Sequence, residues 1–194
     1  MLMARNLMAF MFTHLRRQRP CGPACHAKLV YMRWCLAALI VFHVYGRAQN
    51  LPAVPDNLKP PGNETLAQQA RATGDQVYTC DGSGWVFTRP DAKLFADSGK
   101  QIGSHFGGPT WEWSDGSRVI GRPVANFTPD PDSIPWLLLT ATDHEGEGVM
   151  RRVSSIQRLS TKGGMAPTGG CDASHKGKEV RSPYTAVYFF YTRR

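Results

Sequence analysis

Short runs of β-branched and aromatic residues alternate with turn-forming residues over most of this 194-residue chain. Gln76–Asp81 and Trp85–Thr88 flank a Gly-Ser-Gly turn, and Thr110–Trp113 and Arg118–Ile120 flank an Asp-Gly turn. Runs of this length between Gly, Pro, Asp and Ser indicate β-hairpins. Trp136–Ala141 is apolar on both faces, which is typical of a buried strand. The pattern predicts an all-β fold, an antiparallel β-sandwich or barrel of about eight to nine short strands.

The segment before this domain has the features of an export leader. An apolar run, Cys35–Tyr45, follows Arg33 and precedes Gly46-Arg47-Ala48, which places small residues at both positions that a signal peptidase recognises. We therefore predict a signal peptide within a leader of residues 1–48, and a secreted, periplasmic or extracellular location. Residues 1–31 are interpreted as an over-extended start, because a chain beginning at Met32 would have a signal peptide of ordinary length.

The charge distribution separates the leader from the rest of the chain. The first 50 residues contain seven of the 23 Lys and Arg residues and no Asp or Glu, so residues 51–194 hold 16 basic and all 15 acidic residues. A nearly neutral domain lacks the basic face that nucleic-acid binding requires, and we predict no nucleic-acid partner. The apolar run is shorter than the roughly 20 residues that span a bilayer, so we predict no stable membrane span. The alternative to a cleaved signal peptide is that the apolar run stays in place as an N-terminal membrane anchor.

Two further segments complete the predicted organisation. Residues 49–75 are a Pro-rich lead-in segment of extended, linker-like composition. Within it, residues 64–72 have helix-forming composition and are equally compatible with a first strand. Residues 76–194 form the predicted β-domain.

The cysteines divide between leader and domain. Cys21, Cys25 and Cys35 fall in the leader, so its removal leaves only Cys80 and Cys171. Two cysteines in an exported chain most simply form a disulfide, here closing a loop of about 90 residues. A metal pair and two free thiols are the alternatives.

Several phrases of the domain resemble one family. They are Gln76–Asp81, Gly103–Glu112, Asp115–Ser117, Ile134–Leu139, Ile156–Gly164, Gly170–Asp172 and Pro183–Tyr191. In this order they are similar to the exported bacterial and fungal family called domain of unknown function 3455, over about residues 52–192. The resemblance implies export and a small domain, and it supplies no established activity.

Aromatic residues suggest a binding role. Trp111 and Trp113 lie in one expected strand, and alternation along the last strand places Tyr184 and Tyr188 on the same face. If exposed, these side chains would offer a platform for a polysaccharide or another cell-surface component. We therefore predict a non-catalytic envelope or extracellular binding module. The alternative is that these residues form a large aromatic core.

A second hypothesis is a secreted enzyme or metalloprotein. His105 lies between glycines and could act with Glu112 as a base, although it could equally bond its own turn and pack beside Trp111. A metal would require the fold to gather His105, His144 and His175, and no pair among them has the spacing of a zinc or copper motif. We predict no metal and no cofactor. The sequence leaves both catalysis and the oligomeric state open.

Overall fold

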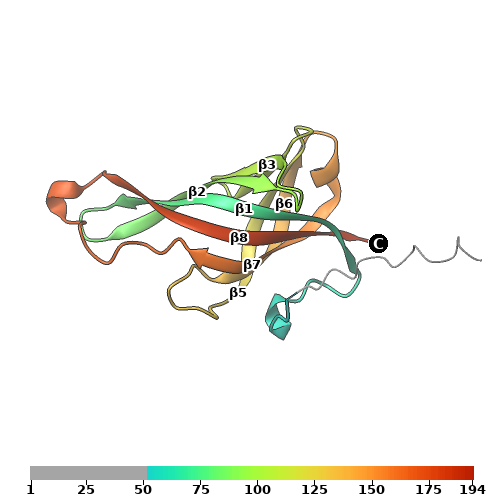
Figure 1. Cartoon of the computed structure of the whole chain (residues 1–194), viewed down its shortest axis with the longest axis horizontal. Coiled ribbons are helices and arrows are strands. Elements are labelled where there is room, and N and C mark those ends of the chain that lie inside the picture. Colours follow the sequence, from blue (N-terminus) through green and yellow to red (C-terminus); the bar gives the residue numbers. More distant parts are fainter. Residues whose placement is uncertain (1–51) are drawn as a thin grey trace, which may run out of the picture. The chain divides into compact units, whose positions relative to one another are not determined.

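Eight antiparallel strands close into one barrel in residues 52–194, the part of the chain that the computed structural model describes (Figure 1). The strands are β1 (Glu64–Cys80), β2 (Trp85–Phe95), β3 (Gln101–Phe106), β4 (Thr110–Trp113), β5 (Arg118–Phe127), β6 (Trp136–Glu145), β7 (Val153–Gly163) and β8 (Glu179–Arg193). Three short 3-10 helices accompany them: η2 (Asp56–Leu58), η3 (Val149–Arg152) and η4 (Ala173–His175). The predicted all-β antiparallel fold is confirmed, and of the two predicted architectures the structure is a barrel.

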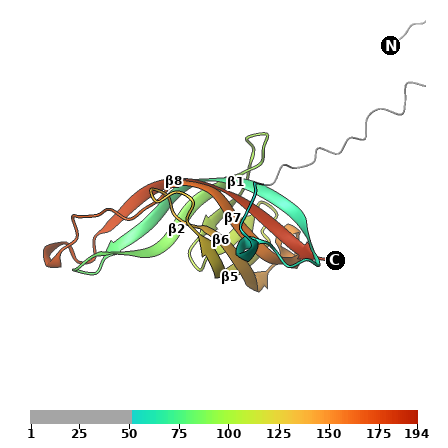
Figure 2. The same cartoon turned by 90° about the horizontal axis from the view of Figure 1, so that it is seen from below.

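The barrel closes through its longest strands, β1 and β8, which curve side by side along the molecule (Figure 2). β1 begins at Glu64, so β-structure extends into the Pro-rich lead-in segment, and the helix expected as one option for residues 64–72 does not form. Ala70 and Ala72 pair with residues of β8 and point into the barrel. Burial at alternate positions against a partner strand overrides the helix propensity of this stretch.

Three strands contain a proline. Two of them extend past the predicted runs, Trp85–Thr88 and Arg118–Ile120. β2 contains Pro90, β5 contains Pro123 and β8 contains Pro183. Each proline lies where its strand has a partner on one side only: β3 meets β2 from Ala92 onwards, and β4 meets β5 only as far as Ile120. β7 likewise meets β8 only beyond Pro183. A missing N–H is tolerated at such an open edge.

Beyond the barrel wall, β1, β2 and β8 continue as a three-stranded arm, which extends to the left in Figure 1. Arg181 of β8 forms ion pairs with Asp75 of β1 and Asp91 of β2. At the tip, Cys80 and Cys171 form the predicted disulfide, with their Cα atoms 5.4 Å apart. The disulfide therefore fixes the loop before β8 to the end of β1.

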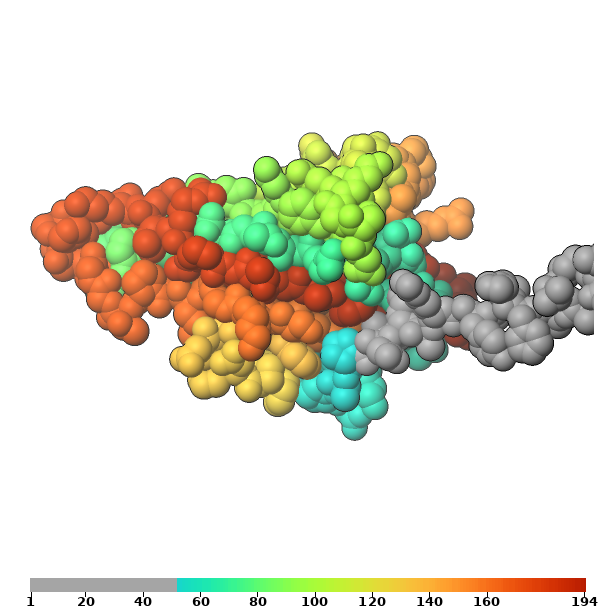
Figure 3. Space-filling model, viewed as in Figure 1, coloured from blue at the N-terminus to red at the C-terminus, as the bar shows by residue number. Residues whose placement is uncertain are grey.

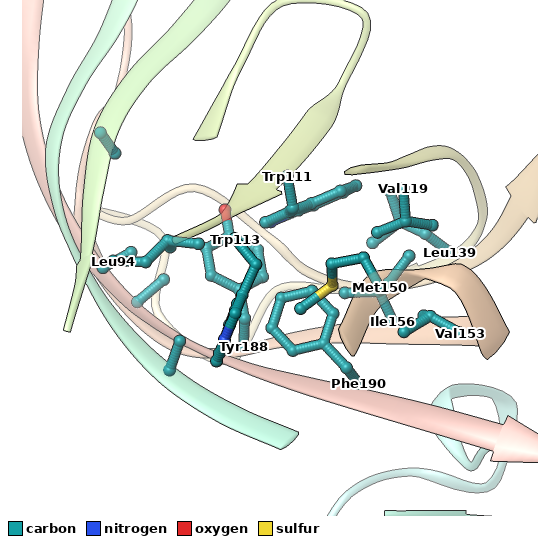
Figure 4. Packing of buried hydrophobic residues seen from close by; sticks show 14 of the residues in the cluster. Leu94, Trp111, Trp113, Val119, Leu139, Met150, Val153, Ile156, Tyr188 and Phe190 are labelled. Atoms are coloured by element: carbon teal, nitrogen blue, oxygen red, sulfur yellow. The ribbon is translucent and has the colours of Figure 1, made fainter. Parts of the chain in front are cut away.

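The lumen holds the main hydrophobic core (Figure 4). Its wall combines small and large side chains: Ala70, Ala72, Ala92 and Ala186 from β1, β2 and β8, with Trp111, Trp113, Tyr188 and Phe190 from β4 and β8. At one end, η3 packs Met150 into the core. Asp115 in the β4–β5 turn holds η3 by accepting a hydrogen bond from the backbone N–H of Val149 (2.9 Å). Asp115 Oδ1 also accepts from the backbone N–H of Ser117 (2.9 Å) inside the turn.

A second core lies on the outer face of the barrel. The lead-in segment packs there, with Leu58 fully buried against Phe189 and Tyr191. Its linker-like composition therefore does not prevent it from joining the folded domain. Gln157 donates from Nε2 to the Leu58 carbonyl (2.6 Å), and Asn57 donates to the Asn126 carbonyl (3.1 Å). In Figure 3 this segment, in cyan, lies beside the region around residue 130, in yellow. Both faces of β8 are therefore buried from Tyr188 to Tyr191, and the aromatic-core alternative is confirmed.

The predictions for the leader, including the signal peptide and the fate of Cys21, Cys25 and Cys35, concern residues outside those that the structure describes. Between residues 52 and 194, no helix is long and apolar enough to cross a membrane.

Replacing both bridged cysteines, in Cys80→Ser with Cys171→Ser, should lower the free energy of unfolding by roughly 4–5 kcal/mol, because the unfolded chain regains the freedom of a long loop. The measurement is urea unfolding of the double variant beside the oxidised wild type. Reductant should lower the unfolding midpoint of the wild type and leave the double variant unchanged. Equal midpoints for the two proteins without reductant would contradict a stabilising bridge.

Candidate functional site

A pocket of about 210 Å³ enters the lumen through a gap in the barrel wall. β3 and β4 have only six and four residues, so past their connecting turn β2 and β5 lose their partners on that side. The residues that line the pocket come from seven strands and one turn: Gln76, Phe87, Thr88, Pro90, His105, Gly108, Pro109, Trp111, Pro123, Leu137, Leu139 and Arg158. Phe87 is about half exposed (50%) and Trp111 is buried (1%), so the pocket leads from the surface to the core.

His105 lies on the inner face of β3. Its Nδ1 is 2.8 Å from the Thr110 carbonyl, which can only accept, so Nδ1 carries the proton and Nε2 is free to accept. Its ring stacks on Trp111 with centroids 4.3 Å apart. Burial lowers the pKa of His105 to about 3, and the nearby positive charge of Arg158 acts in the same direction. His105 is therefore a neutral, packed side chain at pH 7, as the packing alternative expected.

Three of the predicted aromatic residues meet His105 or its neighbours. Trp111 contacts Tyr188 edge to face, with centroids 5.5 Å apart, and the Tyr188 hydroxyl is 3.4 Å from that of Tyr184. Gly121 of β5 permits this arrangement, because a Cβ there would come within 3.1 Å of the Trp111 ring. Burial raises the pKa of both tyrosines, so their hydroxyls stay protonated. Trp111 lines the pocket, whereas the two tyrosines are part of the core beside it.

Glu112 and Trp113 lie apart from this group. Glu112 points outward, opposite to its strand neighbours Trp111 and Trp113, and pairs with Arg118 at 2.5 Å. Trp113 is in the lumen near Phe190, at the η3 end of the core. The barrel wall separates Glu112 from His105, so the structure does not bring together the predicted acid–base pair.

The three histidines also lie apart. His144 lies in β6, with Nε2 2.7 Å from the carbonyl of Val153, the residue after η3. His175 lies in η4, with Nδ1 2.8 Å from Asp172 Oδ1. In the part of the chain that is described, no three His, Cys, Asp or Glu residues form a group suited to a metal ion.

The sequence named two of the twelve pocket residues, His105 and Trp111, and the other ten were missed, among them Gln76 and Arg158. Gln76 is buried, and its Nε2 has no hydrogen-bond partner within 3.5 Å among residues 52–194, although its side chain is close enough to the Tyr184 hydroxyl to act weakly on the pKa of that group; Trp111 Nε1 likewise has no partner. Arg158 donates from Nε and Nη2 to the Pro135 carbonyl (3.1 and 2.8 Å). A signal for Arg158 existed: it stands two positions after Ile156, and alternation in a strand gives both side chains the same face.

These features define a class, a small closed antiparallel barrel of eight strands whose lumen is partly filled and partly open. Barrels of this size are just wide enough to be filled by side chains or to hold one small ligand. The chain belongs to the family described as "Protein of unknown function (DUF3455)", whose model matches residues 60–192. This confirms the family resemblance of the sequence phrases. Searches of curated proteins and of solved structures found no match.

The buried neutral His105 should make stability depend on pH. The pKa of His105 is near 6.5 in the unfolded chain and about 3 in the folded chain. The contribution of neutral His105 to the free energy of unfolding is therefore fully present above about pH 6.5 and decreases as the pH falls below that value. Between pH 7.5 and 5.0 the wild type should lose about 2 kcal/mol of unfolding free energy through this group. Urea unfolding of His105→Phe over that range should show a correspondingly flatter pH dependence. If the free energy of unfolding depends on pH equally in wild type and His105→Phe, the assignment of His105 as a buried neutral side chain is contradicted.

Proposed function

We propose that the chain is an exported, non-catalytic binding module that takes a small ligand in the pocket of the barrel. The observation that carries this proposal is the pair of unpartnered buried donors, Gln76 Nε2 and Trp111 Nε1, both on pocket-lining residues. A buried polar group without a partner costs free energy, and a ligand that accepts these hydrogen bonds would remove that cost. Export is supported by the leader features of residues 1–48.

The pocket supports a small ligand better than an open polysaccharide surface. A sugar platform needs exposed aromatic faces, and Trp111, Trp113, Tyr184 and Tyr188 are all buried. Phe87 at the pocket mouth is exposed, and Leu137 and Leu139 continue the apolar lining inward. Apolar walls with a few convergent polar groups are typical of small-molecule sites.

The geometry gives less support to the enzyme hypothesis. His105 and Glu112 lie on opposite faces of the barrel wall. A histidine with a pKa of about 3 is a weak proton acceptor at neutral pH. In a binding module, His105 would act only as a neutral ring that packs against Trp111.

The test is a fragment screen by saturation-transfer NMR on the purified exported chain. Wild type should bind one-ring fragments, and Leu137→Trp should abolish that binding by filling the pocket. Val124→Trp is the matched control, because Val124 is exposed and does not line the pocket.

Two results would contradict the proposal. One is unchanged fragment binding in Leu137→Trp. The other is a wild type that binds no fragment but binds polysaccharides on a glycan array, which would return the site to the surface.

A further inference from the structure

Arg158 points into the lumen. Its neighbours in β7 establish this: Ile156 belongs to the luminal core, while Gln157 and Leu159 face the outer core under Leu58. Arg158 lines the pocket, and its positive charge acts on His105 and on the hydroxyls of Tyr184 and Tyr188. A partly buried cation therefore faces a pocket whose other side chains are neutral at pH 7.

No carboxylate of residues 52–194 pairs with Arg158. None of the ion pairs within residues 52–194 involves Arg158, and no Asp or Glu lines the pocket. Its contacts with the Pro135 carbonyl use two of the five guanidinium N–H donors. Arg158 is partly buried, so solvent solvates part of its charge, and its remaining N–H donors are free to bind an anion that enters the pocket.

The unpartnered polar atoms point to the same chemistry. Gln76 Nε2 and Trp111 Nε1 are donors, as is every N–H of Arg158, whereas the acceptors are Nε2 of neutral His105 and Oε1 of Gln76. Donors outnumber acceptors, and the rest of the wall is apolar, with Leu137, Leu139 and prolines. The complementary ligand has an anionic, acceptor-rich end and an apolar body.

We propose that the pocket binds a small organic acid, with its carboxylate held by Arg158 and the donors of Gln76 and Trp111, and its apolar body against the leucines and prolines of the wall. This inference rests on the proposed function and adds the ligand class. Arginine recognises a carboxylate through paired, charge-assisted hydrogen bonds. A cavity of about 150 Å³ holds benzene, so the pocket of about 210 Å³ suits an acid with a single ring or a short branched chain.

The first test compares benzoate with benzamide, which has nearly the same shape and no charge, by isothermal titration calorimetry at pH 7. Wild type should bind benzoate at least about tenfold more tightly than benzamide. This arm needs no variant, so it stands even where a substitution damages the fold. If fragments bind in the pocket but benzoate shows no advantage over benzamide, the ligand class is overturned and the binding proposal survives. If neither compound nor any fragment binds, both fail.

Arg158→Gln should remove the advantage of benzoate while changing benzamide affinity by less than about threefold. Arg158→Lys should keep part of the advantage, since it keeps the charge and loses the planar fork. Arg152→Gln is the matched control, because this exposed arginine of η3 does not line the pocket. A benzoate preference that persists in Arg158→Gln, or disappears in Arg152→Gln, would overturn the role of Arg158.

Gln76→Leu separates a binding role from a structural one. Replacing a buried donor that has no partner with an apolar group of similar size should leave the unfolding midpoint unchanged or raise it, and should weaken benzoate several-fold. A lower midpoint with unchanged benzoate affinity would contradict this role for Gln76. Inorganic phosphate should not compete with benzoate, because it lacks the apolar body. Equal competition would overturn the assignment to an organic acid.

Discussion

The long antiparallel pairing of β1 with β8 is the interaction on which the rest of the structure depends. It closes the barrel, and by continuing past the barrel wall it also forms the arm that ends in the Cys80–Cys171 bridge. Closure removes the open edges that an eight-stranded sheet would otherwise expose. It also forces the inward side chains of all strands to share one narrow lumen, so each inward residue must fit against residues from distant parts of the chain.

The lumen meets this demand differently at its two ends. Around η3, Trp113, Met150, Val153 and Phe190 fill it with apolar side chains. Towards the gap left by the short β3 and β4, a few polar side chains join an apolar wall, and Arg158 lies there with no ion-pair partner among residues 52–194. Within residues 52–194, the buried side-chain N–H groups that have no partner, Gln76 Nε2 and Trp111 Nε1, lie at that end, and such departures are expected at functional sites. The apolar core around η3 would thus hold the pocket donors of Gln76, Trp111 and Arg158 in position.

Sequence reasoning predicted the features that depend on local chemistry. The turns at Gly82–Gly84 and Asp115–Ser117, the disulfide and the family phrases all follow from neighbouring residues or from simple counting. Features set by distant partners were left open, such as the choice between helix and strand for residues 64–72, or were not predicted, such as the continuation of β2 through Pro90. The pocket belongs to the second kind, because only barrel closure brings Arg158 close to residues of β1 and β4.

The most direct measurement is a ¹H–¹⁵N NMR titration that follows the indole signals of the tryptophans with benzoate. Loss of one signal in Trp111→Phe assigns the Nε1–H that has no partner in the structure. The account predicts that this signal moves in a saturable way, while the signals of Trp113 and Trp136, which do not line the pocket, stay in place. A Trp111 signal that does not move, or indole signals that all move together without saturation, would contradict a ligand site in the lumen.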